Sequence, residues 1–181
     1  MRRLILGSAL AVCLAGCGGS SSSSRSTTTA PAPPVHLASS LRLSSSAFAA
    51  DGPIPPRHTC DGGDVPVPLR WSGVPHGTRE LLLAMRDPDA PGGNFVHWAV
   101  AGIPPTAVDV PPTGVVEGHN SFGSSGYRGP CPPRSDKPHH YVITLSALAG
   151  PSGLGPGFSA DAPVKSAQLA IATLVGTYAR R

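Results

Sequence analysis

The 181-residue chain has little charge and few lysines. Only 13% of its residues are charged, which excludes a coiled coil or a long solvated helix, because both need exposed faces of Glu, Lys and Arg. Lys137 and Lys165 are the only lysines, so the formal charge of +4 does not come from a clustered basic face. Nucleic acid binding requires such a face. We therefore expect no nucleic acid partner.

Most sequence signatures of catalysis are also missing. The chain has no Gly-x-Ser-x-Gly nucleophile elbow, no P-loop and no dinucleotide-binding glycine pattern. It has neither cysteine pairs at zinc-site spacing nor a His-Glu-x-x-His motif. The expectation is therefore a protein without catalytic residues, bound metal or cofactor.

The first 40 residues have the pattern of an export signal followed by a tether. Arg2 and Arg3 precede an apolar run at 4–15, which suits a signal peptide and is too short to cross a bilayer. Leu-Ala-Gly-Cys at 14–17 resembles a bacterial lipoprotein cleavage site, which predicts a signal peptide over 1–16 and lipidation of Cys17. An ordinary secretory cleavage site nearby is the alternative. Residues 17–40, rich in Ser, Thr and Pro, are expected to form a disordered tether. The protein would then be exported and held by lipid at the extracytoplasmic face of the cell membrane.

Two of the four cysteines remain in the part expected to fold. Cys13 would leave with the signal peptide and Cys17 would carry the lipid, which leaves Cys60 and Cys131. Two thiols in an oxidising compartment favour one disulfide. Two free thiols, or Cys131 as a nucleophile, are the alternatives.

The domain, residues 41–181, has the sequence pattern of an all-β fold. Its short apolar runs alternate with clusters taken from 22 Gly and 22 Pro residues. Strands are expected at 67–71, 80–85, 95–103, 141–149 and 168–178, with 80–85 central and buried on both faces because its apolar residues do not alternate. Residues 168–178 also fit a helical stripe, but β-branched residues at every second position favour a strand. A short helix is expected at 159–166.

Two acidic and three histidine side chains stand at positions that suit a binding site. Asp87 and Asp89 follow the central strand two residues apart, so on extended backbone both carboxylates would face one cavity. The alternative is a simple turn in which Asp bonds its own backbone.

The histidines lie within or before expected strands. His97 is expected on the face of Phe95, Ala99 and Ala101, either as a packed core residue or as a ligand. His139 and Tyr141 would share a face, with His140 pointing the other way. Solvated histidines at the start of a strand are the alternative.

The segment at 126–133, Gly-Tyr-Arg-Gly-Pro-Cys-Pro-Pro, combines glycines and prolines that give it a special backbone. A rigid loop of this kind presents backbone N–H groups to an anion, or serves only as a structural loop.

Several motifs in a fixed order resemble the bacterial phosphatidylethanolamine-binding protein family, also called Raf kinase inhibitor-like proteins. They are Asp-Gly at 51–52, Ile-Pro at 54–55, Thr-Cys-Asp-Gly at 59–62, Trp-Ser-Gly at 71–73, Asp-Pro-Asp-Ala-Pro at 87–91, Val-His-Trp at 96–98, the 126–133 segment, His-His-Tyr at 139–141 and Leu-Val-Gly-Thr-Tyr at 174–178. The resemblance covers about residues 41–181.

The resemblance implies a mainly-β fold in which a large central sheet packs on a smaller one, with at most short helices. It also implies an anion pocket at one end, binding phosphate or a phospholipid head group. Its ligand set falls on Asp87, Asp89, His97, Gly129, Pro130, Pro132, His139 and Tyr141. Protonated histidines would strengthen anion binding, and the carboxylates would orient them.

A membrane-anchored binding protein that regulates or inhibits an unidentified partner protein is the function that this resemblance favours. The alternatives are a hydrolase or metal-assisted enzyme built on Asp87, Asp89, His97 and His139, and a surface protein whose pocket has no use.

Overall fold

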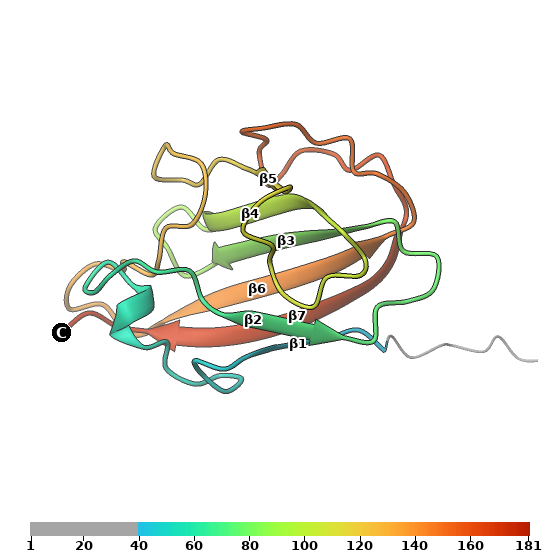
Figure 1. The fold of residues 1–181 in the computed structure, drawn as a ribbon. Helices are drawn as coiled ribbons and strands as arrows, with labels where there is room; N and C mark the ends of the chain where they lie inside the picture. Colours follow the sequence, from blue (N-terminus) through green and yellow to red (C-terminus); the bar gives the residue numbers. More distant parts are fainter. Residues whose placement is uncertain (1–39) are drawn as a thin grey trace, which may run out of the picture. The chain divides into compact units, whose positions relative to one another are not determined.

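The computed structural model describes residues 40–181 (Figure 1). The expected signal peptide, the lipidation site at Cys17 and all but the last residue of the tether lie outside the described residues. The elements are β1 (Arg42–Ser45), the 3-10 helix η1 (Pro56–His58), β2 (Leu69–Ser72), β3 (Glu80–Asp87), β4 (Phe95–Ile103), β5 (Val116–Glu117), β6 (His139–Leu148) and β7 (Gln168–Tyr178). Within this described part, no helix has the length and apolar character needed to cross a membrane.

The strands form two antiparallel sheets, which confirms the expected fold class. The large sheet has five strands in the order β5-β4-β3-β6-β7, and the small sheet pairs β1 with β2. The small sheet packs beside β7 (Figure 1). The central position expected for residues 80–85 is confirmed, since β3 lies between β4 and β6.

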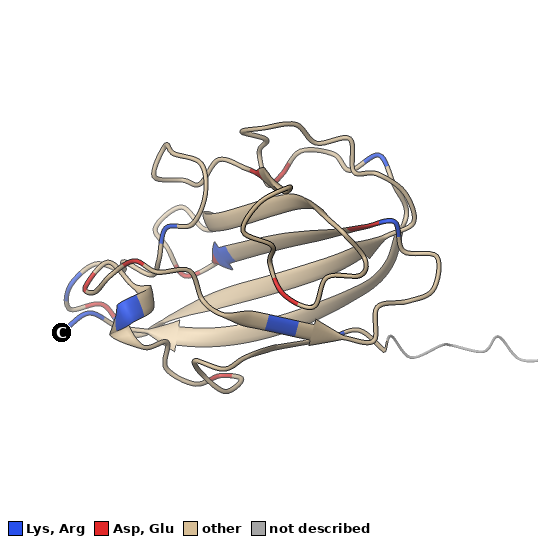
Figure 2. Ribbon diagram, viewed as in Figure 1, with Lys and Arg blue, Asp and Glu red and all other residues tan. Residues whose placement is uncertain are grey.

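The main core lies on one face of the large sheet. Leu81, Leu83 and Met85 of β3 are completely buried with Ile143 and Leu145 of β6, and Leu69 and Trp71 of β2 belong to the same cluster. The other face of β3 is only half-buried, contrary to the expectation of burial on both faces. A smaller cluster that includes Phe158 covers it in part. Along β3, the charged residues occur at the strand ends (Figure 2).

The strands at 95–103 and 168–178 have the expected bounds, and residues 168–178 pair with β6 over their length rather than forming a helix. β6 begins two residues earlier than expected, so both histidines at 139–140 belong to it. The strands β1 and β5 and the helix η1 were not predicted, since they are short and lack an apolar pattern.

The short helix expected at 159–166 is wrong: these residues form turns. Pro163 has no N–H to donate within a helix, and the neighbouring Ser159 pairs instead with His119 in a β-bridge.

Candidate functional site

A buried histidine–aspartate pair lies where the end of β3 meets the start of β6. The Nδ1 atom of His139 lies 2.8 Å from Oδ2 of Asp87, and both side chains are almost completely buried. The other oxygen of Asp87 accepts the backbone N–H of Asp89 at 2.8 Å. On its far side, the Nε2 atom of His139 lies 3.5 Å from the half-exposed carboxylate of Asp136. Because the ionised Asp87 carboxylate only accepts, Nδ1 of His139 carries the hydrogen of this pair, and Nε2 is the ring nitrogen that makes no hydrogen bond within the described residues.

Tyr141 follows His139 on the same face of β6, as predicted. The side chain is completely buried, and its hydroxyl is the one buried side-chain polar atom without a hydrogen-bond partner in residues 40–181. Burial, followed by the nearby negative charge of Asp87, raises the pKa of this hydroxyl. Buried hydroxyls normally have partners, so the protonated and unpartnered Tyr141 hydroxyl is an exception in this fold.

His97 completes the group from β4. Its ring lies 5.1 Å from the Tyr141 ring, edge to face, and its Nδ1 atom lies 2.7 Å from the carbonyl of Arg128 and 3.1 Å from that of Gly129. Carbonyls only accept, so Nδ1 carries the proton and, in the neutral ring, Nε2 is an acceptor. Burial lowers the pKa of His97 below its ordinary value, outweighing the opposite effect of these carbonyls. The structure thus favours a neutral His97, contrary to the expected imidazolium.

The expected face of His97 is also partly wrong. His97 does lie beside Phe95, with ring centroids 5.3 Å apart. Ala99 and Ala101, however, pack with Val96 in the smaller cluster on the other side of the sheet. The β3–β4 register shifts between Met85 and Arg86, where the pairing skips His97. This bulge breaks the alternation on which the prediction relied.

The glycine-proline loop at 126–133 holds His97 in place. Two carbonyls of the loop accept from the His97 ring, as described above. In addition, the Arg128 N–H donates to the His97 carbonyl at 2.9 Å, and the Gly129 N–H donates to Oδ1 of Asp64 at 2.6 Å. The expectation that loop N–H groups bind an anion is therefore wrong for Arg128 and Gly129. A Cβ atom at Gly129 would lie 2.2 Å from the His58 carbonyl, so the close approach requires glycine.

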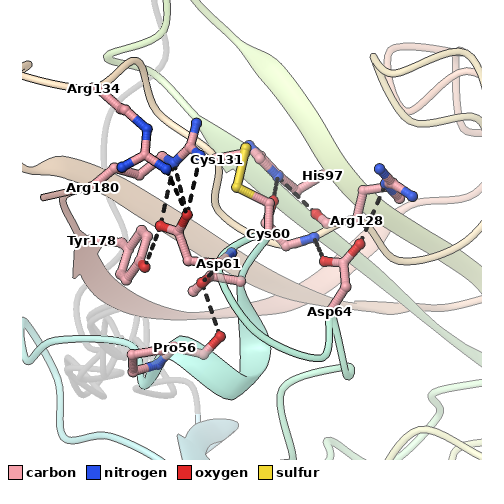
Figure 3. The surroundings of a disulfide bond; sticks show 12 residues. Pro56, Cys60, Asp61, Asp64, His97, Arg128, Cys131, Arg134, Tyr178 and Arg180 are labelled. Carbon is pink, nitrogen blue, oxygen red and sulfur yellow. Dashed lines mark hydrogen bonds and ion pairs between the residues drawn. A yellow bond between two sulfur atoms is a disulfide. The ribbon is translucent and has the colours of Figure 1, made fainter.

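A disulfide joins Cys131 of this loop to Cys60, just after η1 (Figure 3). The Cys60 N–H donates to the Pro130 carbonyl at 3.1 Å, and the Tyr127 hydroxyl donates to the His58 carbonyl at 2.7 Å. Both Pro130 and Pro132 are buried. The two prolines of the expected ligand set thus belong to the support of the loop.

Asp89 lies apart from the buried pair. Its Oδ2 accepts the His140 N–H at 2.8 Å and lies 2.7 Å from Nδ1 of the His140 ring. These hydrogen bonds from His140 hold the pKa of Asp89 below its ordinary value. The His140 ring is exposed, as the predicted alternation of β6 requires. The two carboxylates therefore bind different histidines rather than facing one cavity.

An exposed aromatic ring and an arginine border the cluster. Phe122 is 43% exposed, and its ring contacts those of Phe95 and His97 with centroids 4.9 and 5.5 Å away. The Arg128 guanidinium lies 5.4 Å from the Phe122 centroid and 3.4 Å from the carboxylate of Asp64. The sequence drew attention to Arg128 but not to Phe122 or Asp64, which no motif marks.

A second polar group that the sequence did not reveal lies on the other side of the disulfide (Figure 3). Asp61 accepts the Tyr178 hydroxyl at 2.8 Å and the Arg180 Nε at 3.1 Å. The hydrogen bonds from Arg180, and then from Tyr178, lower the pKa of Asp61. This group ties the end of β7 to the segment after η1. In residues 40–181, no group of three or more His, Cys, Asp or Glu side chains is arranged to hold a metal ion.

Comparisons with known proteins find matches over most of the chain. The family model described as "Phosphatidylethanolamine-binding protein" matches residues 44–179. The Mycobacterium tuberculosis protein named "Putative lipoprotein LppC" is 41% identical over 95% of this chain and 92% of its own length. A Methanothermobacter thermautotrophicus protein of the group named UPF0098 is 40% identical over 77% of this chain and 99% of its own. The crystal structure of Escherichia coli YbcL, described as a member of the mammalian PEBP family, superposes with a TM-score of 0.72 at 32% identity. It covers 78% of this chain and 99% of that one.

Proposed function

The chain belongs to the phosphatidylethanolamine-binding protein family, and we propose that it is a lipid-anchored binding protein, not an enzyme, for a small anion such as phosphate or a phospholipid head group. The observation that carries the proposal is the buried Tyr141 hydroxyl, which has no partner and lies on the same face of β6 as the buried His139. A bound anion would accept from both groups.

The donors and acceptors of the cluster favour an anion that also carries a hydrogen. His139 and Tyr141 would donate to the anion, with charge-assisted bonds from the imidazolium form of His139. The neutral His97 offers an acceptor at Nε2. A singly protonated phosphate, or a phosphate ester bearing an ammonium group, satisfies both requirements, whereas a fully deprotonated anion would leave the His97 acceptor unused.

The absence of a free cysteine thiol in the described cluster argues against hydrolysis through a cysteine nucleophile. Cys131 is held in the disulfide, and the side chains that meet in the cluster are those of Asp87, His97, His139 and Tyr141. Turnover of phosphoesters that disappears in a His97→Ala variant would favour the hydrolase alternative.

Anion titration of the full-length chain tests the proposed site. We expect His139→Ala to weaken binding of inorganic phosphate and of phosphoethanolamine at least tenfold, since a charge-assisted donor is lost. The matched control is His140→Ala, because this neighbouring ring is exposed on the opposite face and bonds Asp89; its affinity should stay within about twofold of that of the unchanged chain. Equal effects of the two substitutions would contradict the proposal.

Binding should also weaken as pH rises through the range in which histidine loses its proton. His97 is a poor source of this dependence, because burial lowers its pKa. The part of the dependence that comes from the His139 ring should therefore be missing in His139→Ala. Ionisation of phosphate itself affects both proteins equally, so the ratio of their dissociation constants at each pH isolates the contribution of His139. A ratio that does not change with pH would refute the imidazolium role.

The membrane anchor rests on the cysteine motif at 14–17 and on the similarity to the M. tuberculosis protein named as a lipoprotein. Two or three acyl chains on Cys17 would hold the protein at the extracytoplasmic membrane surface, where phospholipid head groups or a regulated partner protein are accessible. Cys17→Ala should move the protein from the membrane fraction to the soluble fraction. Unchanged fractionation would exclude this anchor.

A further inference from the structure

A cavity lies apart from the histidine cluster. It has a volume of about 510 Å³ and is lined by the segment leading into β2, by residues 109–112 and by the β4–β5 pair. Its lining is mixed: Leu69, Val110 and four prolines give it apolar surface, and Trp98 and Glu117 stand among its polar side chains, with Ser46, Arg70 and Asp109. The volume lies in the range of small-ligand sites, and the lining offers both apolar surface and polar groups to a ligand.

The walls of this cavity are fixed by hydrogen bonds. The Trp71 N–H donates to the Val108 carbonyl at 3.1 Å, and its indole N–H donates to the Ala107 carbonyl at 2.7 Å, which anchors the loop that continues into residues 109–112. On the opposite wall, the Ser45 hydroxyl donates to the Pro68 carbonyl at 2.8 Å. The prolines restrict both walls further. A ligand would therefore meet a preformed site, which lowers the entropic cost of binding.

One uncompensated charge remains among the lining residues. Asp109 faces Arg70 at 3.6 Å across the rim, so these two charges balance. The Glu117 carboxylate instead accepts the Trp98 indole N–H at 3.1 Å through Oε2, a neutral donor that leaves its negative charge in place. Glu117 is half-buried, and a partly desolvated carboxylate is stabilised by a cation.

We propose that this cavity binds a small organic cation, an ammonium group on an apolar body, with the ammonium on Glu117 and the apolar body against the prolines. An ammonium donates a charge-assisted hydrogen bond to the carboxylate. Leu69, Val110 and the proline rings would remove the apolar body from water. A neutral ligand would leave the charge of Glu117 unpaired, and an anion would be repelled by it.

Titration of the full-length chain with 2-phenylethylammonium tests this site, with 2-phenylethanol as the neutral probe of similar shape. The chain has two tryptophans, so NMR of the indole N–H groups gives a reporter inside the cavity at Trp98 and a reference at Trp71. Trp71→Phe assigns the two signals. We expect the Trp98 signal to shift more than the Trp71 signal, and the ammonium probe to bind at least tenfold more tightly than the neutral one.

Glu117→Gln removes the charge and keeps an oxygen for the Trp98 indole. This variant should bind the ammonium probe about tenfold more weakly and the neutral probe as before. The double rim variant Arg70→Gln, Asp109→Asn removes two balanced charges and should bind both probes like the unchanged chain. Should Glu117→Gln fail to fold, Ser46→Trp serves instead, because it fills the cavity from an exposed lining position and should abolish binding of both probes. Equal affinities for the two probes, or undiminished ammonium binding in Glu117→Gln or Ser46→Trp, would overturn the proposal.

Discussion

Removal of the disulfide between Cys60 and Cys131 should destabilise the fold far more than it disturbs the candidate site. The bond closes a loop over a sequence separation of 71 residues. In the chain-entropy model, a loop of that length restricts the unfolded chain by about 4 kcal/mol at 25 °C. For a domain of this size, that loss corresponds to a decrease in melting temperature of roughly 10 °C.

The native geometry around His97 should survive the loss, because other contacts join the same two segments. The Tyr127 hydroxyl bonds the His58 carbonyl, and the Gly129 N–H bonds Asp64. Neither contact needs the sulfur atoms. The phosphate affinity of the folded variant should therefore stay within about threefold of that of the unchanged chain.

The assay is urea unfolding, followed by tryptophan fluorescence, of a double Cys60→Ser, Cys131→Ser variant and of the unchanged chain with and without reductant. The reduced chain controls for the serine hydroxyls. A loss below about 1 kcal/mol would refute the entropy argument for this loop. A large loss of phosphate affinity in a protein that is still folded would refute the claim that the remaining contacts position His97.

Two further predictions concern the same region. Gly129→Ala should lower the free energy of unfolding by about 2 kcal/mol or more, since the new Cβ would meet the His58 carbonyl at 2.2 Å. Thermal unfolding of this variant and of a Gly155→Ala control checks the prediction. The Cβ added at Gly155 meets nothing within 4 Å, so equal melting temperatures of the two variants would contradict the prediction. Burial lowers the pKa of His97 from 6.5, so the unfolded chain binds this proton more readily. The stability contributed by neutral His97 is complete above pH 6.5 and decreases as pH falls through 6.5 toward the lower folded-state pKa. Urea unfolding at pH 7 and pH 5 should show a smaller decrease for His97→Gln than for the unchanged chain, and equal decreases would exclude this role.

The large sheet was predictable because its strands are long and strongly apolar. Residues 95–103 and 168–178 carry enough β-branched and apolar side chains for their bounds to be found from the pattern alone. The short strands β1 and β5 have no such pattern and exist because a neighbouring strand offers unpaired backbone groups. Their presence depends on tertiary pairing, which the local sequence does not encode.

The candidate site was likewise predictable only in part. The shared face of His139 and Tyr141 followed from regular alternation along β6. The partners of Asp87 and Asp89 did not, because Asp87 ends β3 whereas Asp89 lies in the turn that follows, which places the second carboxylate beside His140. Sequence distance also hid Asp64, whose bond to Gly129 joins segments 65 residues apart.

The bulge at His97 explains why the loop at 126–133 has the composition it has. The register shift leaves His97 without a Cα partner in β3. The carbonyls of Arg128 and Gly129 accept the hydrogen bond from the Nδ1 atom of His97. To place both carbonyls there, the loop must approach the His58 carbonyl so closely that only glycine fits at 129. The prolines and the disulfide that follow fix that approach. The glycine and proline content of this loop therefore serves to orient one buried imidazole, leaving its Nε2 as the acceptor of the site.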